Sequence, residues 1–373
     1  MTLRIGCCIT PHGFGHAARV AAILAAIGRR IDITPVICTT VPRWFFADSL
    51  SMPFSCHAAV TDIGLVQKSS LVEDLPATLQ ALDRFYPLSE KRLVETADIF
   101  HNCACILCDI APLGIAAARR LGVPSVLIEN FTWDWIYEGY FDQEKGFIHY
   151  IKYLQSIYRQ ADYHLQAIPI CHPLEGAVPI APISRARKMG RPEIRRLLAI
   201  DEQAIVILMT MGGIGGDAYG IRPLQRAGEY VFLLAGQGKS PAVSGNLRFL
   251  PGECGLFHPD LISASDLVVG KVGYSTLAEV YGAGVPWAYI PRKAFPESQV
   301  LVEFIRQNRM GFEVSADDVH NGSWLHQLPE QVNMQRCNKS SENGAECAAG
   351  FIVDRVVLHR KKQTGTCNES SYS

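Results

Sequence analysis

The sequence predicts an α/β protein made of two doubly wound halves. The first half opens with residues 3–10 (LRIGCCIT), an apolar run with branched side chains that is typical of a buried parallel strand. A glycine loop, an Ala/Ile/Leu helix to about residue 29 and a second strand at 33–39 follow it. The second half repeats this plan from the strand 204–209 (AIVILM) and the glycine loop 210–216. Alternating strands and helices of this kind form parallel sheets with helices on both faces.

Length and composition fit two domains of ordinary size. The chain has 373 residues, of which 48% are hydrophobic, so a large core can form. A Pro-rich stretch at 173–182 reads as a linker. We therefore expect Rossmann-like domains at residues 1–178 and 179–361, followed by a polar, disordered tail at 362–373. The net charge is -1 and the basic residues are scattered, so nothing indicates a nucleic-acid partner.

The loop after the first strand reads PHGFGHAAR and allows two interpretations. Its Gly13-x-Gly15-x-x-Ala18 spacing matches the dinucleotide-binding fingerprint. That fingerprint also requires an acidic residue after the second strand to hold a ribose, and residues 39–42 (TTVP) contain none. Binding of NAD or FAD is therefore disfavoured, and we expect no cofactor.

Two histidines in this loop are better explained by catalysis or ligand binding. They lie where a parallel strand delivers its loop to the ligand crevice, and His16 is our candidate general base. His12 is expected to contact a ligand or to make a structural hydrogen bond. Asp109 ends a later strand, so it should lie on the same rim and could fix the imidazole tautomer of His16. The alternative is that Asp109 caps the following helix.

An aromatic segment, NFTWDWIY at 130–137, follows another strand. Its rings could form a stacking platform for a sugar, or they could equally belong to the core. Residues 57–70 (HAAVTDIGLVQKSS) are expected to hold another strand and a polar loop that carries Asp62 and Gln67.

The stretch 266–291 (DLVVGKVGYSTLAEVYGAGVPWAYIP) predicts a strand, a glycine turn, a helix and a second strand. Its turn contains Lys271, and Ser275 or Thr276 can cap the helix. Free N–H groups and the dipole at a helix N-terminus favour phosphate. Glu279, one turn into the helix, is placed to accept a hydrogen bond from a sugar hydroxyl. The alternative is an ordinary strand–helix packing unit.

The 12 cysteines indicate reduced, buried thiols rather than a metal site. Cys103-x-Cys105-x-x-Cys108 resembles a metal-ligand spacing, but strand alternation would point Cys105 and Cys108 to opposite faces. No signal peptide precedes the first strand and no apolar run reaches the ~18 residues of a membrane helix, so we expect a cytoplasmic protein, with peripheral membrane contact left open.

Taken together, several motifs resemble GT-B glycosyltransferases, and most of all the N-terminal glycosyltransferase-like region of L-arabinokinases and its stand-alone bacterial relatives. The resemblance spans most of residues 3 to 310. The matching pieces are HGFGHAAR (12–19), Asp62-Ile63-Gly64 with Gln67, CDIAP (108–112), NFTWDWIY (130–137) and SASDLVVGKVGYSTLAE (263–279). A more distant similarity is to UDP-glycosyltransferases and MurG-type transferases.

The resemblance implies two Rossmann-like domains facing each other across a cleft, and it implies roles for matching residues. Gly15-His16 matches the pair that carries the base, and Asp109 the aspartate that assists it. Glu279 matches the glutamate that holds the ribose. The acid–glutamine pair that reads the donor sugar would fall at Glu297 and Gln299, with Ser298 inserted, and the usual His-Gly-Gly of the donor signature is here Lys271-Val272-Gly273.

We therefore expect the catalytic residues His16 and Asp109, with no metal ligands. Expected donor-binding residues lie at strand ends and loops of the second half: Gly212, Gly213, Gln237, His258, Lys271, Gly273, Tyr274, Ser275, Thr276, Glu279, Glu297 and Gln299. Expected acceptor-binding residues lie in the first half: His12, Phe14, Gln67, Trp133, Asp134 and Trp135.

The resulting hypothesis is an inverting, metal-independent glycosyltransferase that moves a sugar from a UDP- or dTDP-linked donor to a hydroxyl of a small-molecule or glycan acceptor. One alternative is a non-catalytic or regulatory sugar-nucleotide-binding module. A second alternative is a sugar-nucleotide epimerase on the same fold, which would need further carboxylates at the sugar.

Overall fold

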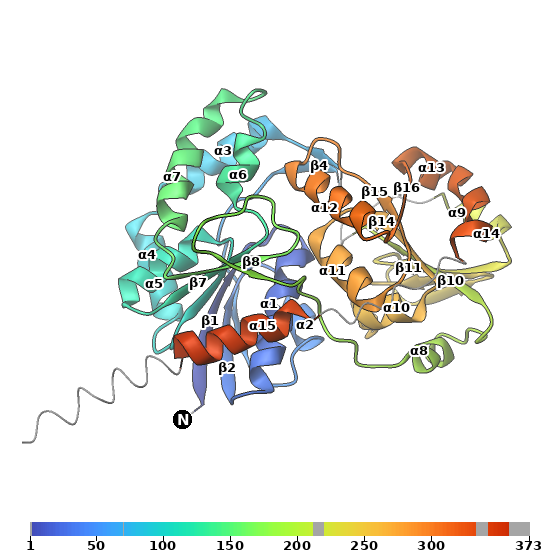
Figure 1. Ribbon diagram of the computed structural model, residues 1–373, viewed down its shortest axis with the longest axis horizontal. Coiled ribbons are helices and arrows are strands. Elements are labelled where there is room, and N and C mark those ends of the chain that lie inside the picture. Colours follow the sequence, from blue (N-terminus) through green and yellow to red (C-terminus); the bar gives the residue numbers. More distant parts are fainter. Residues whose placement is uncertain (1, 70, 212–219, 333–341, 358–373) are drawn as a thin grey trace, which may run out of the picture.

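The computed structural model describes residues 2–69, 71–211, 220–332 and 342–357, and it has two lobes (Figure 1). The first lobe is built on a seven-stranded parallel sheet in the order β3-β2-β1-β6-β7-β8-β9. These strands are β1 (Leu3–Ile9), β2 (Ile33–Cys38), β3 (Ser55–His57), β6 (Ile106–Asp109), β7 (Ser125–Glu129), β8 (Tyr163–Ala167) and β9 (Val178–Ile180). The predicted boundary between residues 178 and 179 thus falls inside β9.

Helices cover both faces of this sheet. They are α1 (Phe14–Gly28), α2 (Arg43–Ala47), α3 (Leu75–Phe85), α4 (Glu90–Ile99), α5 (Pro112–Leu121), α6 (Trp133–Glu138) and α7 (Ile148–Tyr158). α3 and α4 are separate helices, because Pro87 lies between them and the chain is extended at Tyr86. A small antiparallel hairpin, β4 (Gln67–Ser69) and β5 (Val72–Glu73), extends from this lobe.

The second lobe repeats the architecture. Its seven-stranded sheet has the order β12-β13-β11-β10-β14-β15-β16 and is parallel except for β12. The strands are β10 (Ile205–Thr210), β11 (Tyr230–Ala235), β12 (Ala242–Ser244), β13 (Leu247–Leu250), β14 (Leu267–Lys271), β15 (Trp287–Ile290) and β16 (Gly311–Glu313). The helices are α8 (Arg191–Leu197), α9 (Ile221–Arg226), α10 (His258–Ala264), α11 (Tyr274–Ala283), α12 (Pro296–Gln307), α13 (Ala316–Asn321) and α14 (Leu328–Gln331).

The last helix returns to the first lobe. In Figure 1, α15 (Gly344–Phe351) lies across α1, and a turn of π-helix at Ile352–Val357 follows it. Ala345, Ala348 and Ala349 are buried in the core cluster that also contains α1. Arg29 and Arg30 at the end of α1 form ion pairs with Glu346. The small residues of α15 therefore allow a close helix–helix contact that ties the end of the second lobe to the first.

Two glycines let the chain take paths that the site requires. Gly13 precedes α1 with φ 78, a backbone conformation that disfavours other residues, and so turns the chain from β1 into the helix. Gly270 in β14 lies so close to β10 that a Cβ atom would be 2.0 Å from the Thr210 carbonyl oxygen. Both positions lie at the carboxyl ends of central strands, where ligands bind in doubly wound folds.

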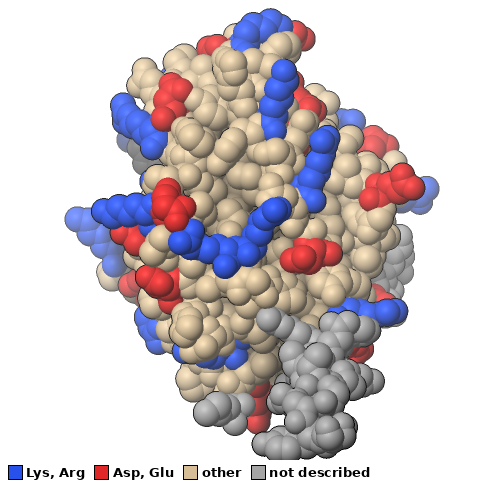
Figure 2. All heavy atoms as spheres, turned by 90° about the vertical axis from the view of Figure 1, so that its left-hand side faces the viewer, with Lys and Arg blue, Asp and Glu red and all other residues tan. Residues whose placement is uncertain are grey.

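The face over α4, α5 and α7 carries charges of both signs. Figure 2 shows Lys and Arg interspersed with Asp and Glu on this face. Arg120 pairs with Glu90, and Lys91 with Glu95. This face therefore presents no continuous basic surface to a nucleic acid. In the part of the chain that is described, no helix is long and apolar enough to cross a membrane.

Candidate active site between the two lobes

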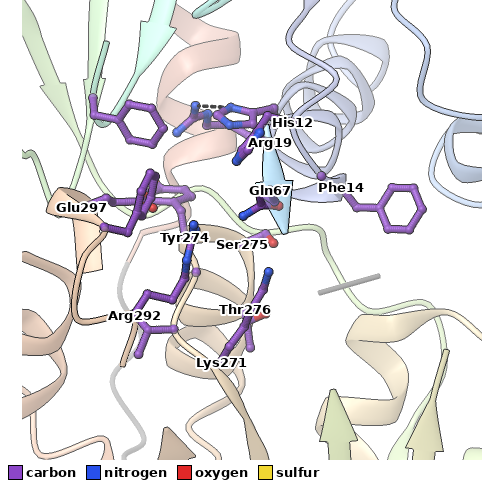
Figure 3. Close-up of a pocket in the computed structure, with 17 residues that line it drawn as sticks. His12, Phe14, Arg19, Gln67, Lys271, Tyr274, Ser275, Thr276, Arg292 and Glu297 are labelled. Atoms are coloured by element: carbon purple, nitrogen blue, oxygen red, sulfur yellow. Dashed lines mark hydrogen bonds between the residues drawn. The ribbon is translucent and has the colours of Figure 1, made fainter. Parts of the chain in front are cut away.

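A cavity of about 120 Å³ lies where the carboxyl ends of the two sheets face each other. The loop after β1 supplies His12 and His16, and the hairpin supplies Gln67. The second lobe contributes the turn between β14 and α11 and the loop between β15 and α12. Figure 3 shows side chains from both lobes converging on this space, with Gln67 near its centre. The fold therefore brings histidines, a helix N-terminus and cations from distant segments of the chain together around one cavity.

His16 and Asp109 are in direct contact. His16 Nδ1 lies 2.7 Å from Asp109 Oδ1, His16 is 8% exposed, and Asp109 is fully buried. An ionised carboxylate can only accept a hydrogen bond, so in the neutral imidazole the proton lies on Nδ1 and the lone pair on Nε2. Ile110, just after Asp109, has φ 42, which is uncommon for a branched residue, and it marks a strained turn at this rim. The expected contact is present, whereas the catalytic role of the pair stays a prediction.

Arg19 is a member of this network that sequence reasoning missed. Its Nε atom donates to Asp109 Oδ2 and its Nη2 atom to Asp109 Oδ1, both at 2.7 Å, and Nη1 donates to Asn130 Oδ1 at 2.7 Å. Burial alone would raise the pKa of Asp109, but Arg19 and then His16 outweigh it and hold that pKa below its usual range. The available signal was an arginine inside the apolar run HAARVAAILAAI, one helical turn after His16.

His12 and Phe14 lie on the same loop. Burial, reinforced by His16, Arg292 and Lys271, lowers the pKa of His12 to about 3, so this imidazole is neutral at physiological pH. Its ring meets Trp133 edge to face at 5.1 Å. Phe14 stacks on Phe45 at 4.9 Å and lines both this cavity and the neighbouring one. Both residues thus line the cavity, and their role as ligand contacts stays a prediction.

The N-terminus of α11 faces these histidines. Gly273 precedes the helix, no side chain caps its N-terminus and no acidic residue lies in its first turn, so its N–H groups and dipole can act on an anion. Lys271, Ser275 and Thr276 line the cavity beside it. Burial and then Arg292 lower the pKa of Lys271 to about 8. Tyr274 is used structurally, because its hydroxyl donates to the Ile168 carbonyl and accepts from the Ile183 N–H group.

The predicted sugar-reading pair is divided by the structure. Glu297, at the start of α12, lines the cavity and accepts a hydrogen bond from Asn130 Nδ2 at 2.7 Å. Burial raises the pKa of Glu297. Gln299 is exposed and does not line the cavity. It lies two positions after Glu297 on α12, and on an α-helix residues two positions apart point about 200° away from each other. Arg292, which the sequence analysis did not single out, lines the cavity instead.

A second cavity of about 120 Å³ adjoins the first and shares Phe14, Ser275 and Thr276 with it. Its walls include His258, Glu279 and Trp44. Glu279 is engaged on both oxygens, by Arg185 Nε at 2.8 Å and by His258 Nδ1 at 2.9 Å. Burial alone would raise the pKa of Glu279, but Arg185 and His258 together lower it. Gln237 lines neither cavity, and Gly212 and Gly213 lie outside the described residues.

The aromatic segment belongs to the first-lobe core. Trp133 is 1% exposed, stacks on Tyr137 and donates its indole N–H to Asp62. Asp134 and Trp135 are half-buried, and none of Trp133, Asp134 and Trp135 lines either cavity. The segment is helical, so its odd-numbered rings do not share one face as they would in a strand.

No group of three or more His, Cys, Asp or Glu side chains in the described residues is arranged to hold a metal ion. Cys103, Cys105 and Cys108 form no disulfide bond among the described residues. Metal independence nevertheless stays a proposal.

Comparison with known proteins places this site in context. No family model matches the chain. L-arabinokinase of Arabidopsis thaliana is 25% identical in an alignment of 360 residues that covers 94% of this chain and 34% of the arabinokinase. The chain thus spans about a third of that relative. An uncharacterized glycosyltransferase of Methanopyrus kandleri is 26% identical over 276 residues, covering 68% of this chain and 76% of that protein.

A solved structure shows the fold. A UDP-glucosyltransferase from Polygonum tinctorium, described as capable of glucosylating indoxyl, superposes with a TM-score of 0.61 at 13% identity, over 94% of this chain and 98% of that one. Such low identity supports a conclusion about the fold alone. The predicted two-lobed GT-B fold is therefore confirmed, as is the sequence resemblance to L-arabinokinase.

Proposed function

We propose, on the premise that this chain has the GT-B fold and is homologous to part of L-arabinokinase, that it is an inverting glycosyltransferase. It moves a sugar from a nucleoside-diphosphate sugar, UDP- or dTDP-linked, to a hydroxyl of a small-molecule or glycan acceptor, without a divalent metal ion. One observation carries the proposal. His16, held from behind by the buried Asp109, lines the same interlobe cavity as the N-terminus of α11. The first group suits proton removal, and the second suits a phosphate.

His16 acts as the general base. Its Nδ1–H group is held by Asp109, so Nε2 is free to take the proton of an acceptor hydroxyl. The hydroxyl oxygen then attacks the anomeric carbon as the bond from that carbon to the diphosphate oxygen breaks. Because the base is on the first lobe and the diphosphate is held by the second, attack comes from the face opposite the leaving group. A single displacement of this kind inverts the anomeric carbon.

The diphosphate takes up the electron pair of the broken bond. The N–H groups at the start of α11, the hydroxyls of Ser275 and Thr276 and the Lys271 ammonium are the groups that would stabilise its charge. Together these donors and the ammonium would stabilise the leaving group without a divalent cation. The nucleoside would extend into the second cavity, toward Trp44 and Glu279.

A specific observation also supports a binding module as a second candidate function. Both oxygens of Glu279 already have protein partners, and Arg19 pairs with both oxygens of Asp109. A site with so many internal partners could bind a sugar nucleotide without reacting with it. We extend the proposal to a cytoplasmic reaction, because the described cysteines form no disulfide bonds.

Mass spectrometry with a panel of nucleotide sugars and hydroxyl acceptors tests the proposal. The expected result is a glycosylated product together with released nucleoside diphosphate, in buffer containing a chelator. NMR of the product should show the opposite anomeric configuration to that of the donor. Nucleotide binding with no product from any combination would favour the binding module, and retention of configuration would contradict the displacement described above.

A further inference from the structure

The β4–β5 hairpin of the first lobe crosses the cleft and docks on the second lobe. In Figure 1, β4 lies beside α12 and β15 rather than beside the sheet of its own lobe. Leu71 packs against the second-lobe core cluster that contains Ile290 and Val314. Glu73 forms an ion pair with Arg292, and the two side chains are only 4% and 7% exposed. The hairpin thus connects the two lobes through one apolar contact and one buried ion pair.

The register of the hairpin places a second side chain in the cavity. Gln67 and Glu73 are opposite each other in the antiparallel pair, so their side chains project from the same face. Glu73 reaches Arg292, and Gln67 enters the interlobe cavity (Figure 3). Arg292 is held from one side by Glu73 and itself lines the same cavity.

Two hydrogen-bond donors in this cavity have no acceptor among the described residues. They are Gln67 Nε2 and Arg292 Nε, and both atoms are buried. A buried donor without a partner costs roughly 1–3 kcal/mol, so such groups are rare unless a ligand or water satisfies them. Lys271 adds a cation to the same wall. All three residues carry hydrogen-bond donors and line the same cavity, and the two cations among them favour a negatively charged acceptor.

The surrounding charges are compatible with an anion. His12 is neutral, and Arg19 is balanced by Asp109. Glu297 is the carboxylate that would oppose an anion. Its Oε1 atom accepts from Asn130, and burial raises its pKa.

We infer that Gln67, Lys271 and Arg292 form an oxyanion site that is complete only when the β4–β5 hairpin is docked on the second lobe. Its ligand is a phosphate or carboxylate group of a substrate. This inference rests on the proposed function, because only a glycosyltransferase has a donor or an acceptor to which the oxyanion could belong. Glu73 is a positioning residue, because it acts through Arg292. Neither Arg292 nor Glu73 was identified from sequence.

Titration calorimetry with pyrophosphate tests the site directly, using the full chain. Gln67→Glu replaces the amide donor with a carboxylate and should weaken pyrophosphate binding by about 10- to 100-fold, as expected for the loss of a hydrogen bond to a charged group. It should not lower the melting temperature, because Gln67 Nε2 has no partner to lose and the new carboxylate can pair with Lys271 or Arg292. Arg292→Lys keeps the charge but removes Nε, and should weaken binding by about tenfold.

Two neighbouring substitutions serve as matched controls. Lys68→Gln changes the next residue of the hairpin, whose side chain is 63% exposed, and Arg306→Lys changes an arginine of α12 that is 60% exposed. Both should bind pyrophosphate within about twofold of the wild type. The inference would be overturned if the wild-type protein bound no pyrophosphate at about 10 mM, a concentration above the Kd of even a weak specific site. Equal affinity in Gln67→Glu, Arg292→Lys and the controls would also overturn it.

Parallel titrations with UDP, UMP and inorganic phosphate separate the sources of the oxyanion. If the two site variants weaken UDP more than UMP, the site takes the donor diphosphate. If the two variants weaken the binding of inorganic phosphate alone, and phosphate and UDP bind at the same time, the site takes an anionic group of the acceptor. Pyrophosphate binding without UDP binding would contradict the proposed nucleotide donor but support this site. UDP binding that neither variant alters, with pyrophosphate also unaffected, would leave the proposed function standing and refute the site.

Discussion

The N-termini of α1 and α11 face each other across the cleft. They have similar backbone structures, but the polar groups around them differ in whether they have hydrogen-bond partners inside the protein. A Cβ atom on Gly15 of α1 would lie 3.5 Å from Ser275 Oγ of α11. Each helix follows a central strand, starts after a glycine and has no side-chain cap. In α1, His16 and Arg19 are bound to Asp109 inside the protein. Around α11, donors such as Arg292 Nε still lack an acceptor among the described residues.

The difference suggests how the two lobes divide the work. A buried network with its hydrogen bonds made is rigid, and rigidity suits a base that must present one nitrogen in one direction. A site with buried donors left over gains its partner only when a ligand arrives. The first lobe is therefore preorganised for proton transfer, and the second is prepared for an anion. The following predictions test this comparison, from the largest expected effect to the smallest.

Arg19→Met should destabilise the protein by about 3–5 kcal/mol, because it leaves Asp109 as a buried charge with its main partner removed. Urea unfolding measures the change. Arg30→Met is the control, since Arg30 also forms an ion pair but its side chain is 43% exposed, and it should cost less than about 1 kcal/mol. A loss below about 1 kcal/mol for Arg19→Met would show that the α1 network is not the rigid element described here.

Trp44→Ala should weaken UDP binding by about 1–3 kcal/mol if the nucleobase stacks on this ring in the second cavity. Fluorescence or calorimetric titration gives the affinity. Trp135→Ala is the matched control, because Trp135 lines neither cavity, and its UDP affinity should be unchanged. The reverse pattern, with Trp135 sensitive and Trp44 indifferent, would restore the aromatic segment at 130–137 as the ligand platform.

Anion affinity should fall as the pH rises through the pKa of Lys271, which is about 8. The ammonium is charged below that pH and attracts an oxyanion, and above it the neutral amine does not. UDP binding measured from pH 7 to 9 should therefore weaken by up to about tenfold, or roughly 1.4 kcal/mol. Lys271→Arg should remove this dependence, because a guanidinium stays protonated. If the UDP affinity of the wild type did not change between pH 7 and 9, the charge of Lys271 would not act on the ligand.

The sequence was most informative where local pattern determines structure. Apolar strands followed by glycine loops predicted β1 and β14 closely, and the common rim of parallel strands predicted that Asp109, at the end of β6, would meet His16. The sequence was least informative where distant segments meet. Nothing local to Glu73 or Arg292 indicates that a hairpin of one lobe holds an arginine of the other. The rings at 130–137 remained ambiguous, because burial of Trp133 depends on the helices packed around it.

The central claim, that His16 removes the acceptor proton while the second lobe holds the nucleotide, is tested most directly by His16→Ala. The measurement is turnover with the active donor and acceptor, together with UDP affinity of the same protein. The account predicts that turnover falls by about 10²- to 10⁴-fold and that UDP affinity stays within about twofold, because general-base help acts on the chemical step. Undiminished turnover in His16→Ala would contradict the account, and would show that the proton leaves by another route.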